Sequence, residues 1–171
     1  MELKDLTDET IKLFGVNDPS ELGSSLTKAC DDQAMLQGFC DLVDGDLSKD
    51  WLQMIYQYYL ADRKDKKQDY TPASIARFMG MLAGDAERVI DMCAGSGALI
   101  IQKWNLNHEI SFTAIEIDEN VIPFLLFNMV LRNIRCDVLM LDALTDEAPK
   151  KTWKITKGEK FGCITSYKPT V

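Results

Sequence analysis

The feature that most constrains this chain is a pair of glycines that closely follows a short apolar run. Residues 87–98 read Glu-Arg-Val-Ile-Asp-Met-Cys-Ala-Gly-Ser-Gly-Ala, and a helix-like segment follows at 99–104. The pattern predicts a β-strand, a tight turn and a helix start. Gly95 and Gly97 permit the backbone angles of such a turn, and without Cβ atoms they leave room for a ligand. Ile100 stands where a dinucleotide fingerprint has its third glycine, so a nicotinamide cofactor is the least favoured ligand.

Acidic residues end three predicted strands. Asp91 ends the first strand, Glu116 follows the apolar run 110–115, and Asp142 follows the run 136–141. The carboxyl ends of neighbouring parallel strands meet at one edge of a sheet, where an acid can accept hydrogen bonds from ribose hydroxyls. The three acids therefore indicate a nucleoside-type site, and the glycine turn suits a ligand whose tail is a small zwitterion.

Four segments together resemble a known set of motifs. They are Asp-Tyr-Thr-Pro at 69–72, Asp-Met-Cys-Ala-Gly-Ser-Gly at 91–97, Glu-Ile-Asp at 116–118, and Asp142. In this order they resemble the cofactor motifs of S-adenosylmethionine (SAM)-dependent adenine-N6 DNA methyltransferases, such as the modification subunits of type I restriction systems. The resemblance runs from about residue 50 to the C-terminus.

The resemblance implies an α/β fold of the Rossmann-like SAM methyltransferase type. Its partial parallel sheet would have the strand order 3-2-1-4, with residues 160–165 as the fourth strand beside the first. We expect an N-terminal helical region at 1–45 and the SAM-binding methyltransferase-like domain at 46–171.

The resemblance also assigns the cofactor site. The residues expected to bind SAM are Tyr70, Thr71, Pro72, Asp91, Met92, Cys93, Ala94, Gly95, Ser96, Gly97, Glu116, Ile117 and Asp142. Thr71 and the turn at 91–97 would hold the methionine part. Glu116 would bind the ribose, Ile117 would lie on the adenine face, and Asp142 would accept a hydrogen bond from the adenine amino group.

The expected catalytic motif of this family is Asn/Asp-Pro-Pro-aromatic, and it is degenerate in this chain. Tyr167, Lys168, Pro169 and Thr170 occupy its place, and only Pro169 matches. Lys168 would bring a cation close to the sulfonium, and Thr170 has no face on which a flipped-out base could stack. The catalytic residues thus stay unknown, and the chain is expected to be inactive alone or to work with a partner.

Composition limits the partners. The chain has 171 residues and a formal net charge of −8, whereas proteins that hold duplex DNA alone usually show a basic face. DNA is the partner that the resemblance implies, with weak binding by this chain alone. The predicted edge strand favours self-association or a protein partner along 160–171.

Other chemistry and other locations find little support in the sequence. The five cysteines fit no metal or disulfide spacing and His108 is the only histidine, so no metal site is expected. Without a transmembrane-length apolar run or a signal sequence, we expect a soluble, cytoplasmic protein.

Two functional hypotheses stay open. One is a SAM-binding domain of the adenine-N6 DNA methyltransferase type, and the alternative is a non-catalytic SAM-binding or assembly module that acts through a partner protein. A methyltransferase acting on a small molecule or a protein is a third interpretation, for which the sequence shows no substrate groups.

Local patterns predict the remaining elements. Helices are expected in three stretches of 1–45 and at 50–63. The helix at 50–63 has an apolar stripe that favours a core position, formed by Trp51, Met54, Ile55, Tyr58 and Tyr59. Another helix is expected to start at Pro72 after a Thr71 cap and to include the apolar residues up to Leu82. A further helix is expected at 120–133, and a polar connection at 143–159.

Overall fold

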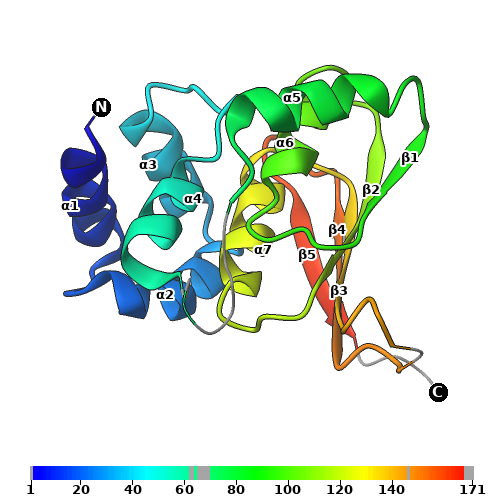
Figure 1. Ribbon diagram of the computed structural model, residues 1–171. Coiled ribbons are helices and arrows are strands. Elements are labelled where there is room, and N and C mark those ends of the chain that lie inside the picture. The colour runs from blue at the N-terminus through cyan, green and yellow to red at the C-terminus, as the bar shows by residue number, and fades with distance from the viewer. Residues whose placement is uncertain (1, 62–63, 65–69, 146, 168–171) are drawn as a thin grey trace.

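The computed structural model describes residues 2–61, 64, 70–145 and 147–167. Figure 1 shows the N-terminal helices on one side, a β-sheet on the other, and helix α7 between them. Helices α5 and α6 cover the end of the sheet that carries β1 and β2. The result is an α/β fold, as the sequence predicts.

The N-terminal region is helical, as the sequence predicts. The first helical elements of the chain are α1 (Leu3–Phe14), the short 3₁₀ turn η1 (Pro19–Glu21), α2 (Leu22–Ala29), α3 (Gln33–Leu42) and α4 (Trp51–Ile55). Gly15 ends α1 in the left-handed conformation, at φ 63°. Asp32 caps α3 by accepting from the N–H groups of Ala34 and Met35.

Helix α4 continues as a π-helical turn, η2 (Tyr56–Leu60). Ile55 is buried, as expected for the apolar stripe, whereas Tyr58 and Tyr59 are exposed. The core prediction is therefore wrong for the two tyrosines and for Met54, which is 38% exposed. At the tyrosines, the wider π turn breaks the 3.6-residue period on which the prediction relied. Arg63, the predicted helix end, lies outside the described residues.

The sheet contains five strands within the described residues, in the spatial order β1-β2-β3-β4-β5. They are β1 (Arg88–Asp91), β2 (Ser111–Glu116), β3 (Cys136–Met140), β4 (Lys151–Thr156) and β5 (Cys163–Tyr167). The first three are parallel and are joined by α6 (Ala98–Trp104) and α7 (Ile122–Leu131). Right-handed crossovers in one direction put both helices on the same face of the sheet.

The predicted strand order 3-2-1-4 is wrong at its fourth position. β5 pairs antiparallel with β4, and β4 pairs antiparallel with β3, so β1 is an end strand. The predicted polar connection at 143–159 contains β4, which reads Lys-Thr-Trp-Lys-Ile-Thr. Its lysines, Lys151 and Lys154, are exposed, whereas Thr152 and Ile155 are buried. A hairpin needs no long crossover back to β1.

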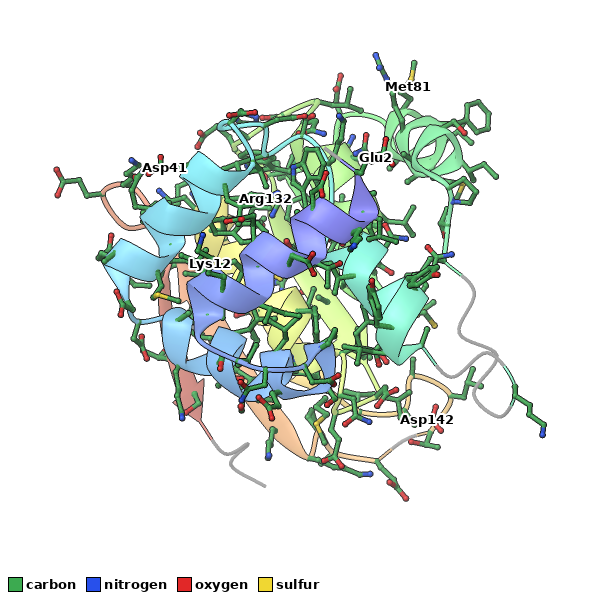
Figure 2. All side chains as sticks on the ribbon, turned by 90° about the vertical axis from the view of Figure 1, so that its left-hand side faces the viewer. Glu2, Lys12, Asp41, Met81, Arg132 and Asp142 are labelled. Atoms are coloured by element: carbon green, nitrogen blue, oxygen red, sulfur yellow. The ribbon has the colours of Figure 1, made fainter. Side chains whose placement is uncertain are left out.

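Two helices differ sharply in burial. α7 is buried along nearly its whole length because the N-terminal helices pack on the side that faces away from the sheet. Helix α5 (Ala73–Leu82) instead packs on α6 through Ala76 and Gly80 and leaves its large apolar residues exposed. Met81 projects from it into the surroundings (Figure 2).

Candidate functional site

The glycine turn joins β1 to α6 as the sequence predicts. Gly95 and Gly97 have φ angles of 55° and 98°, a region that side chains with a Cβ rarely adopt. The N–H of Ala94 donates to the carbonyl of Ile115 at 2.9 Å, which ties the turn to the neighbouring strand β2.

Gly97 also has a packing role. A Cβ at this position would lie 2.7 Å from Cε of Met129 and 3.0 Å from Cδ1 of Leu125. Both side chains belong to α7 and are fully buried. The glycine therefore lets the turn and α7 approach closely, while Gly95 faces the pocket.

Glu116 connects the end of β2 to the glycine turn. Its Oε2 accepts from the N–H of Gly95 at 2.8 Å. Its Oε1 accepts from the N–H groups of Ile117 and Asp118 at 2.9 and 2.8 Å. A carboxylate has about four acceptor positions, so lone-pair capacity for a further donor remains.

A pocket of about 220 Å³ brings seven predicted site residues together; we call it the glycine-turn pocket. These residues are Tyr70, Thr71, Cys93, Ala94, Gly95, Ser96 and Glu116. They come from the segment before α5, the glycine turn and the end of β2, so three separate parts of the chain form one concave site.

Two further cavities adjoin this pocket. One, of about 390 Å³, also contains Tyr70 and Thr71 and adds the predicted Pro72. The other, of about 530 Å³, shares Glu116 and adds Ile117, whose side chain is 56% exposed. The three cavities share wall residues, and we call them together the crevice.

Asp91 and Met92 line a different cavity, the groove between α5 and β1. Oδ1 of Asp91 accepts from the N–H of Cys93 at 3.2 Å, whereas its buried Oδ2 has no hydrogen-bond partner among the described residues. Burial raises the pKa of Asp91, and the neighbouring Glu116 charge adds to the increase. An acceptor of this kind is suited to a cationic donor.

Tyr70 is held as a neutral phenol. Burial raises the pKa of its hydroxyl, with a smaller effect of Tyr56, whose ring contacts that of Tyr70 edge to face at 6.0 Å between centroids. Tyr70 therefore keeps its O–H donor at neutral pH.

Thr71 is not the helix cap that the sequence predicts. The N-cap position of α5 is Pro72, and no side chain caps the helix there. Thr71 lies one residue further out and lines the crevice instead, because the ring of Pro72 fixes the extended entry into the helix.

Asp142 lies apart from the other predicted ligands. It follows β3, its Oδ1 accepts from the N–H of Leu144 at 2.9 Å, and it lines none of the cavities described above. Of the expected catalytic motif, the backbone of Tyr167 ends β5, and Lys168, Pro169 and Thr170 lie outside the described residues.

A buried polar cluster supports the turn from behind. Asp50, Ser96, Asn128 and Arg132 are all at most 8% exposed and are joined by side-chain hydrogen bonds. Of these four residues, only Ser96 was predicted from the sequence to belong to the site. Asp50 precedes a helix, which signals a cap, but no local pattern reveals a contact with Asn128, 78 positions away.

Neither a metal centre nor a membrane span is found in the described part of the chain. No group of three or more metal-ligating side chains occurs among residues 2–61, 64, 70–145 and 147–167. The same residues contain no helix with the length and apolar character needed to cross a bilayer. Cys93 and Cys163 are exposed, whereas Cys30, Cys40 and Cys136 are buried.

The architecture is that of a class I SAM-dependent methyltransferase. It is similar to a crystal structure described as a protein of that class from Listeria monocytogenes, with a TM-score of 0.54 and 16% sequence identity. The match covers 85% of this chain and 53% of that chain, so the present chain spans about half the length of its structural relative. No curated protein matches the sequence.

Residues 47–169 match the N-6 DNA methylase family. The chain belongs to this family, as the resemblance predicted, and both family and fold identify S-adenosylmethionine as the cofactor.

The residues of the crevice fit this cofactor. SAM carries an ammonium, a carboxylate, a sulfonium and a ribose with two hydroxyls. Glu116 retains acceptor capacity, and Gly95 leaves the backbone accessible. Outside the crevice, in the groove between α5 and β1, Oδ2 of Asp91 is a buried acceptor without a partner among the described residues. Donors of the ligand would thus meet acceptors of the protein.

Proposed function

We propose that this chain binds SAM in the crevice that runs from Thr71 past the glycine turn to Ile117. The observation that carries the proposal is the glycine-turn pocket, in which Thr71, Gly95 and Glu116 meet from three segments of the chain. The methionine part would lie against Thr71 and the turn at 91–97, and the ribose against Glu116. Ile117 would contact the adenine.

The adenine amino group needs an acceptor of its own. We propose Asp142 as its acceptor because Asp142 follows β3, the strand that pairs with β2, and Glu116 ends β2. Oδ1 of Asp142 accepts from the N–H of Leu144, whereas its Oδ2 has no hydrogen bond to the described residues. The proposed set is completed by residues that shape the walls of the crevice and of its surroundings, namely Tyr70, Pro72, Met92, Cys93, Ala94, Ser96 and Gly97.

For the reaction, family and fold support methyl transfer, and we propose the N6 amino group of adenine in DNA as the acceptor. SAM supplies the methyl group when it is bound; this chain's own residues would bind and orient it. The sequence Tyr-Lys-Pro-Thr at 167–170 has Tyr167 where the motif has Asn or Asp, and Thr170 where it has the aromatic residue that would stack on adenine. We therefore propose that methyl transfer needs groups beyond those of this chain.

An alternative function is a non-catalytic SAM-binding or assembly module. It is favoured by the same degenerate motif and by the formal charge of −8, which opposes DNA binding by this chain alone. In either case we propose a protein partner or self-association along 160–171, where β5 is an end strand of the sheet, and a cytoplasmic location.

The test is calorimetric titration of the folded chain with SAM and with S-adenosylhomocysteine. We expect both to bind, and we expect Glu116→Ala to weaken SAM binding by up to about 3 kcal/mol, because one substitution removes acceptors that the ribose hydroxyls need. Glu109→Ala is the matched control, since Glu109 is an exposed glutamate paired with Lys157 outside the crevice.

The titrations of the wild type and of Glu116→Ala test the SAM site and the ribose ligand separately. Absence of SAM binding to a folded wild-type chain would refute the SAM site. Normal binding by wild type and equally strong binding by Glu116→Ala would remove Glu116 from the ribose position and leave the cofactor assignment standing.

A further inference from the structure

The segment 47–50, just before α4, is fixed by hydrogen bonds from side chains at the C-terminal ends of α6 and α7. Arg132 of α7 donates from Nε to the carbonyl of Leu47 at 2.8 Å and from Nη2 to the carbonyl of Lys49 at 2.6 Å. The side-chain amides of Gln102, in α6, and of Asn105, its C-cap, donate to the carbonyl of Ser48 at 2.9 and 2.8 Å. Each of these three carbonyls is thus held by a side chain of a helix that flanks the crevice.

Asp50 at the end of this segment contacts the glycine turn directly. Its Oδ2 accepts from the hydroxyl of Ser96 at 2.6 Å. Its Oδ1 accepts from Nδ2 of Asn128 at 2.9 Å and from the N–H of Gln53 at 3.0 Å, the second being the cap of α4. One carboxylate thereby joins α4, α7 and the turn.

Asn128 holds the same turn residue at a second point. Its Nδ2 also donates to the carbonyl of Ser96 at 2.9 Å, and its Oδ1 accepts from Nη1 of Arg132 at 2.8 Å. Ser96, between the two glycines, is therefore fixed through both its hydroxyl and its carbonyl. A turn that contains two glycines has unusual backbone freedom, and these bonds restrict it.

The composition of the cluster argues against a purely structural role. Burying a carboxylate and a guanidinium costs several kcal/mol in desolvation, and well-packed apolar residues often stabilise a core equally well. What apolar residues would not provide is a directional hold on Ser96. The cluster therefore lowers the stability of the fold relative to an apolar core, and its hydrogen bonds fix the geometry of the glycine turn.

We infer that Asp50 is a positioning residue of the cofactor site, acting through Ser96 to fix the Gly95 and Gly97 peptides in the orientation that receives the methionine part of SAM. This inference rests on the proposed SAM site. It makes the segment before α4 part of the binding machinery.

The experiment compares Asp50→Ser with Asp32→Ser. Both aspartates cap helices of the N-terminal half, and serine is itself a good cap, so the helix ends are preserved. Only Asp50 reaches the glycine turn. We expect Asp50→Ser to raise the Kd for SAM by about tenfold and Asp32→Ser to change it by less than about twofold.

A conservative variant and a ligand-free measurement exclude a general loss of stability. In Asp50→Asn the side-chain oxygen can still accept from Gln53 and Asn128 while its amide donates to the hydroxyl of Ser96, so most of the affinity should return. Without ligand, the amide resonances of Gly95 and Gly97 should shift in Asp50→Ser but not in Asp32→Ser. If Asp50→Ser does not fold, Asn128→Ala, which removes the other hold on Ser96, carries the same expectation.

The outcomes are distinct. Wild-type SAM affinity in folded Asp50→Ser, or unchanged Gly95 and Gly97 resonances in it, would overturn the inference. Failure of the wild type to bind SAM would refute the proposed function alone, because the ligand-free resonances still report whether Asp50 fixes the turn.

Discussion

Oδ2 of Asp91 is buried and has no hydrogen-bond partner within the described part of the chain, and such an oxygen costs stability until a ligand donates to it. Its folded-state pKa is raised by burial above the unfolded value of about 3.9, so the folded chain holds this proton more tightly than the unfolded chain. The contribution of Asp91 to folding therefore becomes less favourable from about pH 4 upward, until the raised pKa is passed.

Asp91→Asn should remove this pH-dependent loss. We expect the free energy of unfolding of the variant, relative to wild type, to rise between about pH 4 and neutrality, and the Kd for SAM to rise about tenfold because the carboxylate acceptor is gone. Urea unfolding across pH and calorimetry measure the two effects. Asp85→Asn, an exposed site just before β1, is the control and should show neither effect; a pH-independent stability difference in Asp91→Asn would contradict the prediction.

The sequence predicted individual residues of the site better than it predicted the contacts between them. Gly95, Gly97 and Glu116 lie where a strand, a turn and a second strand of ordinary pattern should put them, since those patterns are local. Asp50 and Asn128 escaped prediction because their roles come from bonds across 46 and 78 positions. Their chemistry is visible only when helices that are distant in the sequence pack together.

Among the elements, the parallel strands and their helices were predictable because each follows its own hydrophobic period. The strand order was not, since it depended on β4, whose lysines resemble those of a solvated loop. The same period failed at η2, where a π turn shifts the register of Tyr58 and Tyr59. Where propensity and periodicity agree the prediction is confirmed, and where the chain departs from a regular repeat it is wrong.

The position of β4 can be tested by a cross-link. Ile155 lies directly opposite the native Cys136 in the antiparallel pair of β4 and β3. Opposed residues in such a pair have Cα atoms about 4.5–5.5 Å apart, a separation that a disulfide spans. We expect Ile155→Cys to form a disulfide with Cys136 on mild oxidation, detected by peptide mapping.

The control is Ile164→Cys on β5, opposite Ile155 and one strand further from Cys136. The two strand spacings amount to roughly 10 Å, too far for a disulfide. A cross-link from Ile164→Cys to Cys136, or none from Ile155→Cys, would show that the hairpin does not lie beside β3.

For the whole molecule, ligand binding and folding are linked because the crevice is assembled from segments that meet only in the folded chain. SAM at about 100 times its Kd should raise the free energy of unfolding by about 2.7 kcal/mol, provided that it binds only the folded state. For a chain of this size the shift in Tm is about 5 to 11 °C.

Differential scanning fluorimetry measures this shift, with methionine alone as the control ligand. Methionine lacks the nucleoside that Glu116 and Ile117 would bind, and at the same concentration it should leave the Tm nearly unchanged. Equal shifts with both compounds would mean that the nucleoside part makes no contact.

The order β1-β2-β3-β4-β5 repeats the order of the strands along the chain. Each strand is therefore laid down beside the one synthesised just before it, and no strand has to be inserted between two that have already paired. As the chain leaves the ribosome, the sheet can grow from a single edge, first by two helical crossovers and then by a hairpin. A 3-2-1-4 arrangement would require the fourth strand to return to the first across a sheet already built, whereas here assembly proceeds in the direction of translation.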